Sequence, residues 1–320
     1  MGLGQIGMGY DNSPLLEDAV YSHAKAFSSH PDFHLECAVD PDPSKRSAFT
    51  DRYGVTAYSD THDALANHRV DLAIIATPTV NHLNQIETIL ANGKVRLLLC
   101  EKPLSNSLDE SRYIVRICKD RGVLLFVNYI RRSEPGVLEV MRRIQQDDIM
   151  RPIKAVTWYS KGFLHNGSHF LNLLEYWLGS VRGFQVIRSR PVGDSRQAIE
   201  RPDVYINFEF GEAIFLALHE KNFTYHSIEM LALNGRLIYH SGGRSITWSP
   251  GTPAPDAHGY RSLSESCEEI YSELTKYQWH VASEVSKAMK GKAAHLCDGE
   301  TALTTSENIH MILEKANELR

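Results

Sequence analysis

Lys102 lies in the stretch Cys100-Glu101-Lys102-Pro103, directly after a run of apolar residues, and this position points to acid–base chemistry. A short apolar run of this kind is typical of a buried strand. In a doubly wound sheet, the carboxyl ends of the strands form the ligand crevice. A partly desolvated lysine there can have its pKa lowered enough to exchange a proton with a substrate hydroxyl. From these four residues alone, the alternative is a surface ion pair.

A histidine at the start of a predicted helix is the second candidate for proton transfer. The stretch HNGSHFLNLLEYW places His169, Asn172 and Tyr176 on one helical face. Because the ordinary pKa of histidine is near neutrality, His169 could take a proton as a carbinol is oxidised; a structural histidine is the alternative. His165 lies four residues earlier, but no third ligand is apparent, so no metal site is predicted.

A glycine-rich turn at the start of the chain could hold phosphates. Gly2, Gly4 and Gly7 match the pattern G-x-G-x-x-G, with Gln5 and Ile6 inside it. The glycines of this pattern allow a tight turn, a close approach of a pyrophosphate and close packing of the next helix. The N-terminus of that helix would offer N–H groups and the positive end of its dipole. An ordinary glycine-rich turn is the alternative.

Asp40 ends the next apolar run and could accept hydrogen bonds from the ribose hydroxyls of a dinucleotide. A turn residue in the stretch DPDP is the alternative. The spacing from Gly7 exceeds the usual ~20 residues, so residues 10–14 are expected to break the first helix and supply the excess. A carboxylate disfavours a 2′-phosphate, so NAD is expected rather than NADP, although Lys45 and Arg46 leave NADP open.

The elements that must position these residues follow two patterns. Up to about residue 128, short apolar runs alternate with helical patterns, as in βαβ units. Later segments alternate residue by residue, as in antiparallel strands. The predicted fold class is α/β: a Rossmann domain with a doubly wound parallel sheet over 1–128, and an α+β domain with an open, mostly antiparallel sheet over 129–320. A surface loop is expected over 249–260, and the last two helices over about 263–290 and 299–318.

Only Met1 precedes the glycine turn, although such a turn normally follows the central strand of its sheet. Without that strand, the neighbouring strands would carry unpaired N–H and C=O groups, each costing about 1–3 kcal/mol. We therefore expect a strand upstream of Met1. The alternative is a truncated product with damaged cofactor binding.

Composition narrows the class of protein. The 320 residues, 42% hydrophobic and 23% charged, suffice for two domains with buried cores. A net charge of -5 gives no electrostatic reason to expect nucleic acid or an anionic membrane as a partner. Five cysteines without CxxC spacing suit reduced thiols, and no apolar run approaches the ~20 residues of a spanning helix. A soluble, cytoplasmic protein is expected.

Six stretches occur in an order that resembles the glucose–fructose oxidoreductase and inositol 2-dehydrogenase family, Gfo/Idh/MocA: GLGQIG, VDPDPSKR, ATPTVNH, CEKP, VNYIRR and GSHFLNLLEYWLG. The resemblance covers nearly the whole chain. It implies hydride transfer between NAD or NADP and a carbinol carbon of a sugar, cyclitol or nucleotide sugar. It also implies oligomerisation through the open sheet of the second domain, as a homodimer or homotetramer.

The resemblance implies roles for individual residues. Lys102 matches the catalytic lysine of the family, and His169 matches its histidine. Asn172 stands where the family has an aspartate, and an amide cannot accept a proton, so Lys102 is expected to take a larger share. Arg132 matches the start of the substrate domain. The implied cofactor contacts are Gly2, Gly4, Gln5, Ile6, Gly7, Asp40, Thr77, Pro78, His82, Glu101, Lys102 and Asn128.

Two other functions stay open at this stage. One is a lyase or glycosidase that retains its NAD and oxidises a sugar carbon transiently, so that no net NADH forms. The other is an inactive sensor or scaffold. The two features that suggest it are Asn172 and the single residue, Met1, before the glycine turn.

Overall fold

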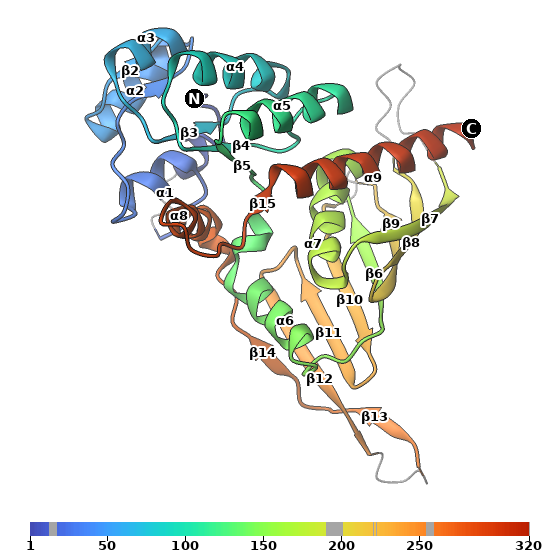
Figure 1. Ribbon diagram of the computed structural model, residues 1–320. Coiled ribbons are helices and arrows are strands. Elements are labelled where there is room, and N and C mark those ends of the chain that lie inside the picture. Colours follow the sequence, from blue (N-terminus) through green and yellow to red (C-terminus); the bar gives the residue numbers. More distant parts are fainter. Residues whose placement is uncertain (13–17, 190–200, 220, 222, 254–258, 320) are drawn as a thin grey trace. The chain divides into compact units, whose positions relative to one another are not determined.

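The computed structural model describes residues 1–12, 18–189, 201–219, 221, 223–253 and 259–319 (Figure 1). They form two compact units: Met1–Ser133 with Thr275–Thr304, and Glu134–Leu274 with Thr305–Arg320. Residues 275–304 therefore pack with the first unit, whereas the sequence-based boundary puts everything after 128 in the second. The chain returns to the first unit because a late helix, at Tyr277–Met289, and a late strand, at Cys297–Asp298, complete its layers.

The first unit is a doubly wound α/β fold. The apolar runs predicted before residue 128 form strands. The strands of this unit pair in parallel except for the late strand β15, which is antiparallel to β5. Its strands are β1 (Ala38–Val39), β2 (Ala57–Tyr58), β3 (Leu72–Ile75), β4 (Leu97–Cys100), β5 (Leu124–Val127) and β15 (Cys297–Asp298). Its helices are α1 (His23–Ser29), α2 (Pro43–Tyr53), α3 (Thr61–Asn67), α4 (His82–Asn92), α5 (Leu108–Asp120) and α8 (Tyr277–Met289).

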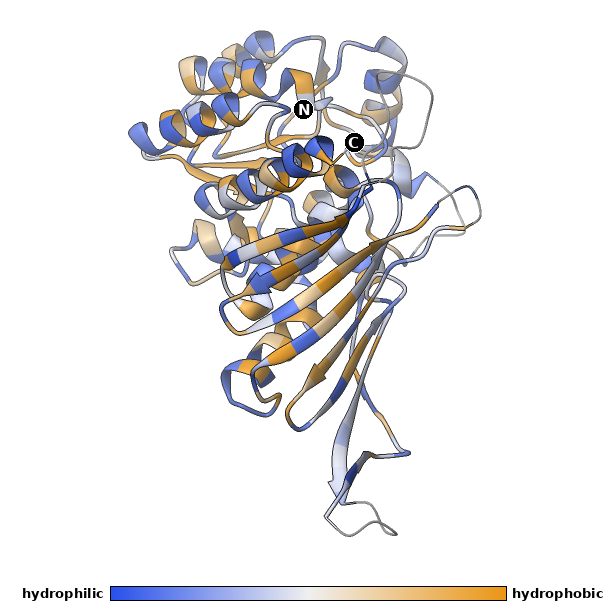
Figure 2. Cartoon of the chain, turned by 90° about the vertical axis from the view of Figure 1, so that its right-hand side faces the viewer, coloured by the Kyte–Doolittle hydropathy of each residue, from blue (hydrophilic) through white to orange (hydrophobic). Residues whose placement is uncertain are grey.

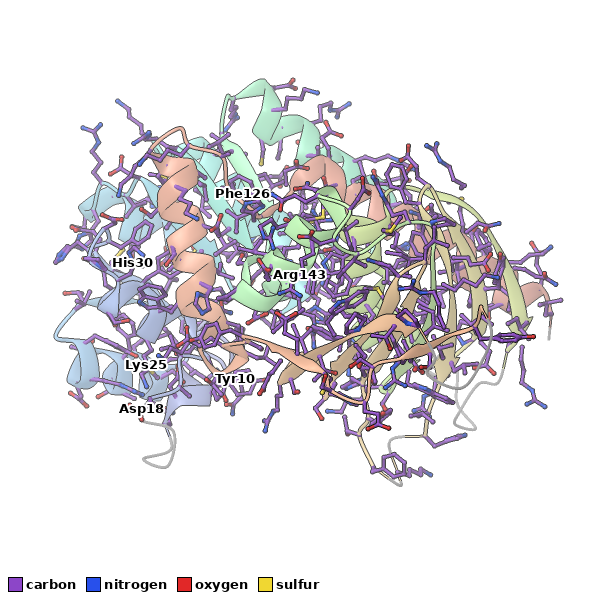
Figure 3. All side chains as sticks on the ribbon, turned by 90° about the horizontal axis from the view of Figure 1, so that it is seen from below. Tyr10, Asp18, Lys25, His30, Phe126 and Arg143 are labelled. Carbon is purple, nitrogen blue, oxygen red and sulfur yellow. The ribbon has the colours of Figure 1, made fainter. Side chains whose placement is uncertain are left out.

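Helices cover both faces of the sheet β3–β4–β5, because alternate residues of β4 point to opposite sides. Leu98 and Cys100 pack in one cluster with α4 and α5, and Leu97 and Leu99 pack in another with α1 and α8. The second cluster includes Phe126, labelled in Figure 3, from β5. Because helices cover both faces of such a strand, none of its side chains faces solvent, and its residues form an unbroken apolar run in the sequence.

The sheet of the first unit is split in two. Strands β1 and β2 form one sheet, and β3, β4, β5 and β15 form the other. Met1 and Gly2 connect them, because the Gly2 N–H donates to the Val39 carbonyl at 2.8 Å and the Met1 amine donates to the Ile74 carbonyl at 2.7 Å. The start of the chain thus lies between β1 and β3, where the central strand of a doubly wound sheet is expected.

The second unit is built on a large open sheet with the strand order β13-β12-β11-β10-β6-β9-β8-β7, and β14 also pairs with β12. All its pairs are antiparallel except β6 with β9. The strands are β6 (Ile153–Tyr159), β7 (Val181–Arg188), β8 (Asp203–Phe208), β9 (Gly211–Ala217), β10 (Ser227–Ala232), β11 (Gly235–His240), β12 (Ser245–Pro253), β13 (Arg261–Leu263) and β14 (Glu268–Ile270).

Helices cover one face of this sheet. They are α6 (Pro135–Gln145), α7 (Ser168–Leu178) after a π-helical turn (Phe163–Gly167), and the C-terminal part of α9 (Gly299–Glu318). In β6, Ile153, Ala155 and Tyr159 are buried toward the helices, whereas Lys154 is exposed. Figure 2 shows hydrophilic and hydrophobic residues alternating along the strands. The alternation predicted for half-buried antiparallel strands is confirmed; assembly through this sheet stays a prediction.

Two local predictions differ from the structure. The stretch 249–260, predicted as a loop, begins with the end of β12, up to Pro253, and residues 254–258 lie outside the described residues. The helix predicted from about 263 begins only at Tyr277, because the preceding residues form β14, which pairs with β12. In both places pairing with a neighbouring strand overrides the local signal.

Candidate functional site

The glycine turn is shaped by close backbone contacts. Gly2 has φ +83°, and a Cβ there would lie 2.5 Å from the Ala76 carbonyl oxygen. A Cβ on Gly7 would overlap the carbonyl oxygen of Gly2. A Cβ on Gly4, by contrast, would meet nothing within 4 Å. The first and third glycines are therefore required by the fold, whereas the second leaves open the space that a pyrophosphate needs in this motif.

The helix after this turn is built from two separate pieces of chain. The N–H groups of His23 and Ala24, at the start of α1, donate to the carbonyls of Ile6 and Gly7 at 3.0 and 2.9 Å. The intervening excursion is closed by the buried Asp11 carboxylate, which accepts hydrogen bonds from the N–H groups of Tyr21 and Ser22. Of the break predicted at residues 10–14, positions 13 and 14 lie outside the described residues. Among the described residues α1 begins only at His23, which fits the long spacing from Gly7 to Asp40.

Asp40 is buried at the end of β1 and holds the glycine turn against that strand. Its carboxylate accepts hydrogen bonds from the N–H groups of Leu3, at 2.7 Å, and Asp42, at 2.9 Å. The Arg46 guanidinium donates to the carbonyls of Asp40 and Pro41, at 2.9 and 2.8 Å. These two bonds occupy the Arg46 guanidinium, which would otherwise be available to a 2′-phosphate. The role of Asp40 toward a ribose stays a prediction.

Lys102 follows β4 and is half-buried. Burial lowers the pKa of Lys102 to about 8; the negative charge of Glu101 raises this pKa, and the positive charge of Arg131 lowers it further. At neutral pH the lysine is mostly protonated. Because its pKa is only about one unit higher, a substantial fraction of the neutral form is also present. This supports the predicted acid–base role, since efficient proton transfer favours a pKa near the working pH.

Glu101 is the centre of a buried polar network. The ring Nε2 of His23 donates to its carboxylate at 2.8 Å, and the amide of Asn128 donates to the same oxygen at 2.6 Å. Asn128 also donates to Gln278 of α8 at 3.3 Å. Burial raises the pKa of Glu101, but the bonds from His23 and Asn128 and the charge of Lys102 outweigh it, so the net shift is downward. Glu101 is therefore an anion that stabilises the ammonium form of its neighbour.

The segment Thr77-Pro78 follows β3 and is tied to the end of β4 by His82. The buried His82 ring lies 3.0 Å from the Thr77 carbonyl, 3.1 Å from the Leu104 carbonyl and 3.4 Å from the sulfur of Cys100. The structure thus gives His82 a holding role, and its contact with a cofactor stays a prediction. Burial raises the pKa of Cys100 well above its ordinary value, so this thiol is a packing group.

Four buried polar atoms of this region have no hydrogen-bond partner among the described residues: His23 Nδ1, Thr77 Oγ1, Asn128 Oδ1 and Gln278 Nε2. Buried polar groups are rarely left unpaired, so such atoms are candidates for bonds to a ligand. Together with the open space at Gly4, they fit a bound dinucleotide. They extend from the helix after the glycine turn to the network around Glu101.

His169 and Asn172 lie on α7, in the second unit. Asn172 is fully buried, and its amide donates to the Thr305 hydroxyl of α9 at 3.0 Å. That hydroxyl donates in turn to the carboxylate of Glu175. Leu171, with the other leucines of the helix, anchors α7 in the core. Lys102 belongs to the first unit and His169 to the second, so the predicted pairing of these two side chains stays a prediction.

We expect Asn172→Asp to destabilise the protein, although it restores the residue type of the family. An aspartate cannot donate to Thr305, whose single hydrogen would then have to serve two carboxylates. The new carboxylate would be buried and would compete with Glu175 for the Thr305 hydrogen, and the bond that Asn172 donates would be lost, at a cost of about 1–3 kcal/mol. Because this raises the pKa of the new carboxyl group, the deficit should grow above that pKa and shrink as pH falls.

Urea unfolding at pH 5 and pH 8 measures this deficit, with Asn207→Asp, at an exposed site of β8, as the matched control. Equal stability of the Asn172→Asp variant and the original protein at pH 8 would contradict the prediction.

Sequence reasoning missed three residues of the candidate site. Asp11 bonds to Tyr21 and Ser22, and His23 bonds to Glu101. No local sequence pattern predicts these contacts. Gln278 comes from α8, beyond the predicted domain boundary. The only available signal was Ser22, which caps α1 and marks a helix start directly before His23.

Among the described residues, no group of three or more His, Cys, Asp or Glu side chains could hold a metal ion. Within the same ranges, no helix is both long enough and apolar enough to cross a membrane.

The split parallel sheet, the glycine turn and the acidic residue after β1 define a dinucleotide-binding domain of the Rossmann class. Residues 6–129 match the family model described as "Oxidoreductase family, NAD-binding Rossmann fold". The region 6–129 therefore belongs to the NAD-binding domain of this family, Gfo/Idh/MocA, in agreement with the resemblance of the motifs.

Relatives and solved structures extend the comparison. The chain is 29% identical to scyllo-inositol 2-dehydrogenase (NAD(+)) of Bacillus subtilis over 67% of its own length and 64% of that enzyme, so the match spans less than two thirds of the relative. It is 25% identical to 2,7-anhydro-N-acetylneuraminate hydratase of Escherichia coli over 56% of the chain and 50% of that protein. The WlbA dehydrogenase of Bordetella pertussis, solved with NADH and UDP-GlcNAcA, has a TM-score of 0.73 at 18% identity, with 93% of each chain covered.

Proposed function

We propose that the protein is an NAD(P)-dependent oxidoreductase that transfers hydride between nicotinamide and a carbinol carbon of a sugar, cyclitol or nucleotide sugar. The observation that carries the proposal is the half-buried Lys102 beside an anionic Glu101 at the carboxyl end of β4. The relatives support the substrate class, since their names include a cyclitol dehydrogenase and a sugar-nucleotide complex.

The residues divide the work as follows. Gly4 and the N–H groups of the adjoining turn would hold the phosphates, and Asp40 would accept hydrogen bonds from the ribose. When bound, NAD supplies the hydride acceptor. Lys102, in its neutral form, takes the hydroxyl proton of the carbinol as the C–H hydride leaves, and Glu101 stabilises the ammonium that forms. His169 is the second proposed proton acceptor.

The cofactor we propose is NAD, with NADP as the weaker candidate. A carboxylate at Asp40 repels a 2′-phosphate, and Arg46 is bonded to backbone carbonyls. Calorimetric titration with NAD and NADP tests this choice, and a lower dissociation constant for NADP would overturn it.

The activity is tested by incubating the protein with NAD and each of a panel of inositols, free sugars and UDP-sugars, and following NADH absorbance. We expect NADH to form with at least one member. The control is the Lys102→Met variant under the same conditions, which separates turnover by this site from a contaminating dehydrogenase.

A second function, redox-neutral lyase or hydratase chemistry with retained NAD, is favoured by the hydratase among the relatives. It predicts that substrate is consumed, as followed by mass spectrometry, while no net NADH accumulates. Consumption with stoichiometric NADH would exclude it in favour of the dehydrogenase.

The pH profile of the oxidation should report Lys102. Since its pKa is lowered to about 8 and the neutral form is the base, kcat/KM should rise with pH and level off above about 8. Glu101→Gln removes the charge that raises this pKa, so the midpoint should move to lower pH. Arg131→Gln removes a charge that lowers it, so the midpoint should move to higher pH.

Opposite shifts of the two variants are the expected result in steady-state pH profiles. Shifts in the same direction, or none in either, would show that another group controls the profile.

A further inference from the structure

Two donors from separate elements of the first unit hold one oxygen of the Glu101 carboxylate. His23 Nε2 lies 2.8 Å from Oε1, and the Asn128 amide nitrogen lies 2.6 Å from the same oxygen. His23 begins α1, whereas Asn128 follows β5. Hydrogen bonds to an ionised group are roughly twice as strong as those between neutral groups. These two bonds therefore fix where the negative charge lies beside Lys102.

The His23 ring is itself anchored to the glycine turn. Its backbone N–H donates to the Ile6 carbonyl at 3.0 Å, and Ser22 caps the helix one residue earlier. The side chain is only 4% exposed, and the centroid of its ring lies 6.4 Å from that of Phe27. A buried ring on an anchored backbone has little freedom to turn, so His23 can hold Glu101 in one place relative to the glycine turn.

The bond to Glu101 also determines which ring nitrogen carries the hydrogen. A neutral histidine has one N–H and an ionised carboxylate can only accept, so this hydrogen lies on Nε2. Nδ1 is buried and has no hydrogen-bond partner among the described residues. Within the same ranges, the ring therefore makes its hydrogen bond to Glu101 alone.

This hydrogen bond has a large effect on the charge of Glu101. Burial raises the pKa of the Glu101 carboxyl group, and the bond from His23 is the largest of the interactions that lower it. The net shift is downward, so Glu101 is an anion. Burial lowers the pKa of Lys102, and the charge of Glu101 opposes that effect. The influence of His23 on Lys102 thus passes through Glu101.

Other groups that can carry charge belong to neighbouring elements. Arg131 follows β5, and its charge lowers the pKa of Lys102 further. Cys100 ends β4 and Tyr277 begins α8; burial raises the pKa of both, and the charge of Glu101 adds to the rise. Because these two groups titrate far above the pKa of about 8 of Lys102, neither changes charge where the lysine does.

We propose that His23 is a positioning residue for proton transfer at Lys102: its Nε2–H holds Glu101 as the anionic neighbour of the lysine, and its backbone ties this pair to the glycine turn. The proposal rests on the proposed function for the role of Lys102 in turnover. The path from His23 through Glu101 to Lys102 does not require turnover, so it can be tested without substrate or nucleotide.

The test replaces His23 by leucine, which keeps apolar bulk and removes the donor, and by asparagine, which is too short to reach Glu101. His23→Gln is the conservative variant, because its amide nitrogen lies the same number of bonds from Cα as Nε2. The matched control is His30→Leu, since His30 is a buried histidine at the end of α1 whose ring contacts Ser283. Each substitution is made in the original protein and together with Glu101→Gln.

The readout is the pH dependence of acylation of Lys102 in the nucleotide-free protein, followed by peptide mass spectrometry with the exposed Lys119 as reference. Only the neutral amine reacts, so the midpoint reports the pKa of Lys102. Without the bond from His23, the proton affinity of Glu101 rises and Glu101 competes for the proton of the lysine. We expect His23→Leu and His23→Asn to move the midpoint to lower pH by about half a pH unit or more, but by less than Glu101→Gln, which removes the whole charge.

His23→Gln should restore the original midpoint, and His30→Leu should leave it unchanged. Together with Glu101→Gln, His23→Leu should add no further shift, because the path to Lys102 is then already broken. An additional shift in that background, or an unchanged midpoint for folded His23→Leu or His23→Asn protein, would overturn the proposal. An equal shift with His30→Leu would also do so, because it would show a general loosening of the unit.

Failure of the proposed function would leave these midpoints unaltered, since the labelling needs no turnover. With the substrate found in the panel, the pH profiles of kcat/KM should show the same order of midpoints among the variants. Labelling midpoints that shift while the profiles of kcat/KM do not would contradict the role of His23 in the reaction.

Discussion

Replacing Lys102 by methionine is expected to lower kcat by about 10²–10⁴-fold, the usual contribution of a positioned general acid or base. Methionine keeps the length and the apolar stem of the side chain, so the packing after β4 should persist. Glu101 keeps its bonds to His23 and Asn128, so the surrounding network should also persist. The dissociation constant of NAD should change much less than kcat.

The measurement is steady-state kinetics with the substrate found in the panel, together with NAD titration. Lys119→Met, at an exposed ion pair with Glu300, is the matched control and should leave kcat unchanged. Unchanged turnover in the Lys102→Met variant would remove the site assignment and favour the sensor or scaffold alternative.

Alanine at Gly7 and alanine at Gly4 should have opposite consequences, although the two residues belong to one motif. At Gly7 the new Cβ overlaps the carbonyl oxygen of Gly2, so backbone must move. We expect a loss of about 3 kcal/mol or more, the upper part of the range for overpacking, and a fall in Tm of roughly 6–12 °C. At Gly4 nothing lies within 4 Å, so the free energy of unfolding should change by less than about 0.5 kcal/mol.

The Gly4→Ala protein should instead bind NAD at least tenfold more weakly, because the methyl group fills the space kept for the pyrophosphate. Thermal unfolding without nucleotide, followed by NAD titration of both variants, separates the two effects. A Gly4→Ala protein that binds NAD normally would place the phosphates elsewhere.

Much of the first unit follows from local sequence. The apolar runs in the stretches VRLLLCEKP and GVLLFVNY, which end at Pro103 and near Tyr129, are too short for helices, and they contain the strands β4 and β5. The glycine pattern and the position of Asp40 could also be read directly, because each depends on residues within one βαβ unit. Ser107 caps α5 and Glu110 follows three residues later, a spacing typical of a capping box.

The missed features depend on contacts between distant parts of the chain. The two residues of β15 join the sheet by pairing with β5, and so short a strand has no pattern of its own. The pair His23 and Glu101 lies 78 positions apart, and a helical histidine is more often structural. Asn172 appeared as a loss relative to its family, but its bond to Thr305 belongs to α9, which only the fold brings near.

The two-piece construction of the first helix has a consequence for how this protein can vary. Because Ile6 and Gly7 are bonded directly to His23 and Ala24, the path length along the chain is uncoupled from the spatial separation of the phosphate turn and Asp40. The carboxylate of Asp11, which accepts hydrogen bonds from the N–H groups of Tyr21 and Ser22, closes the two pieces against each other, so the place of the glycine turn beside α1 depends on this side chain rather than on a continuous helix.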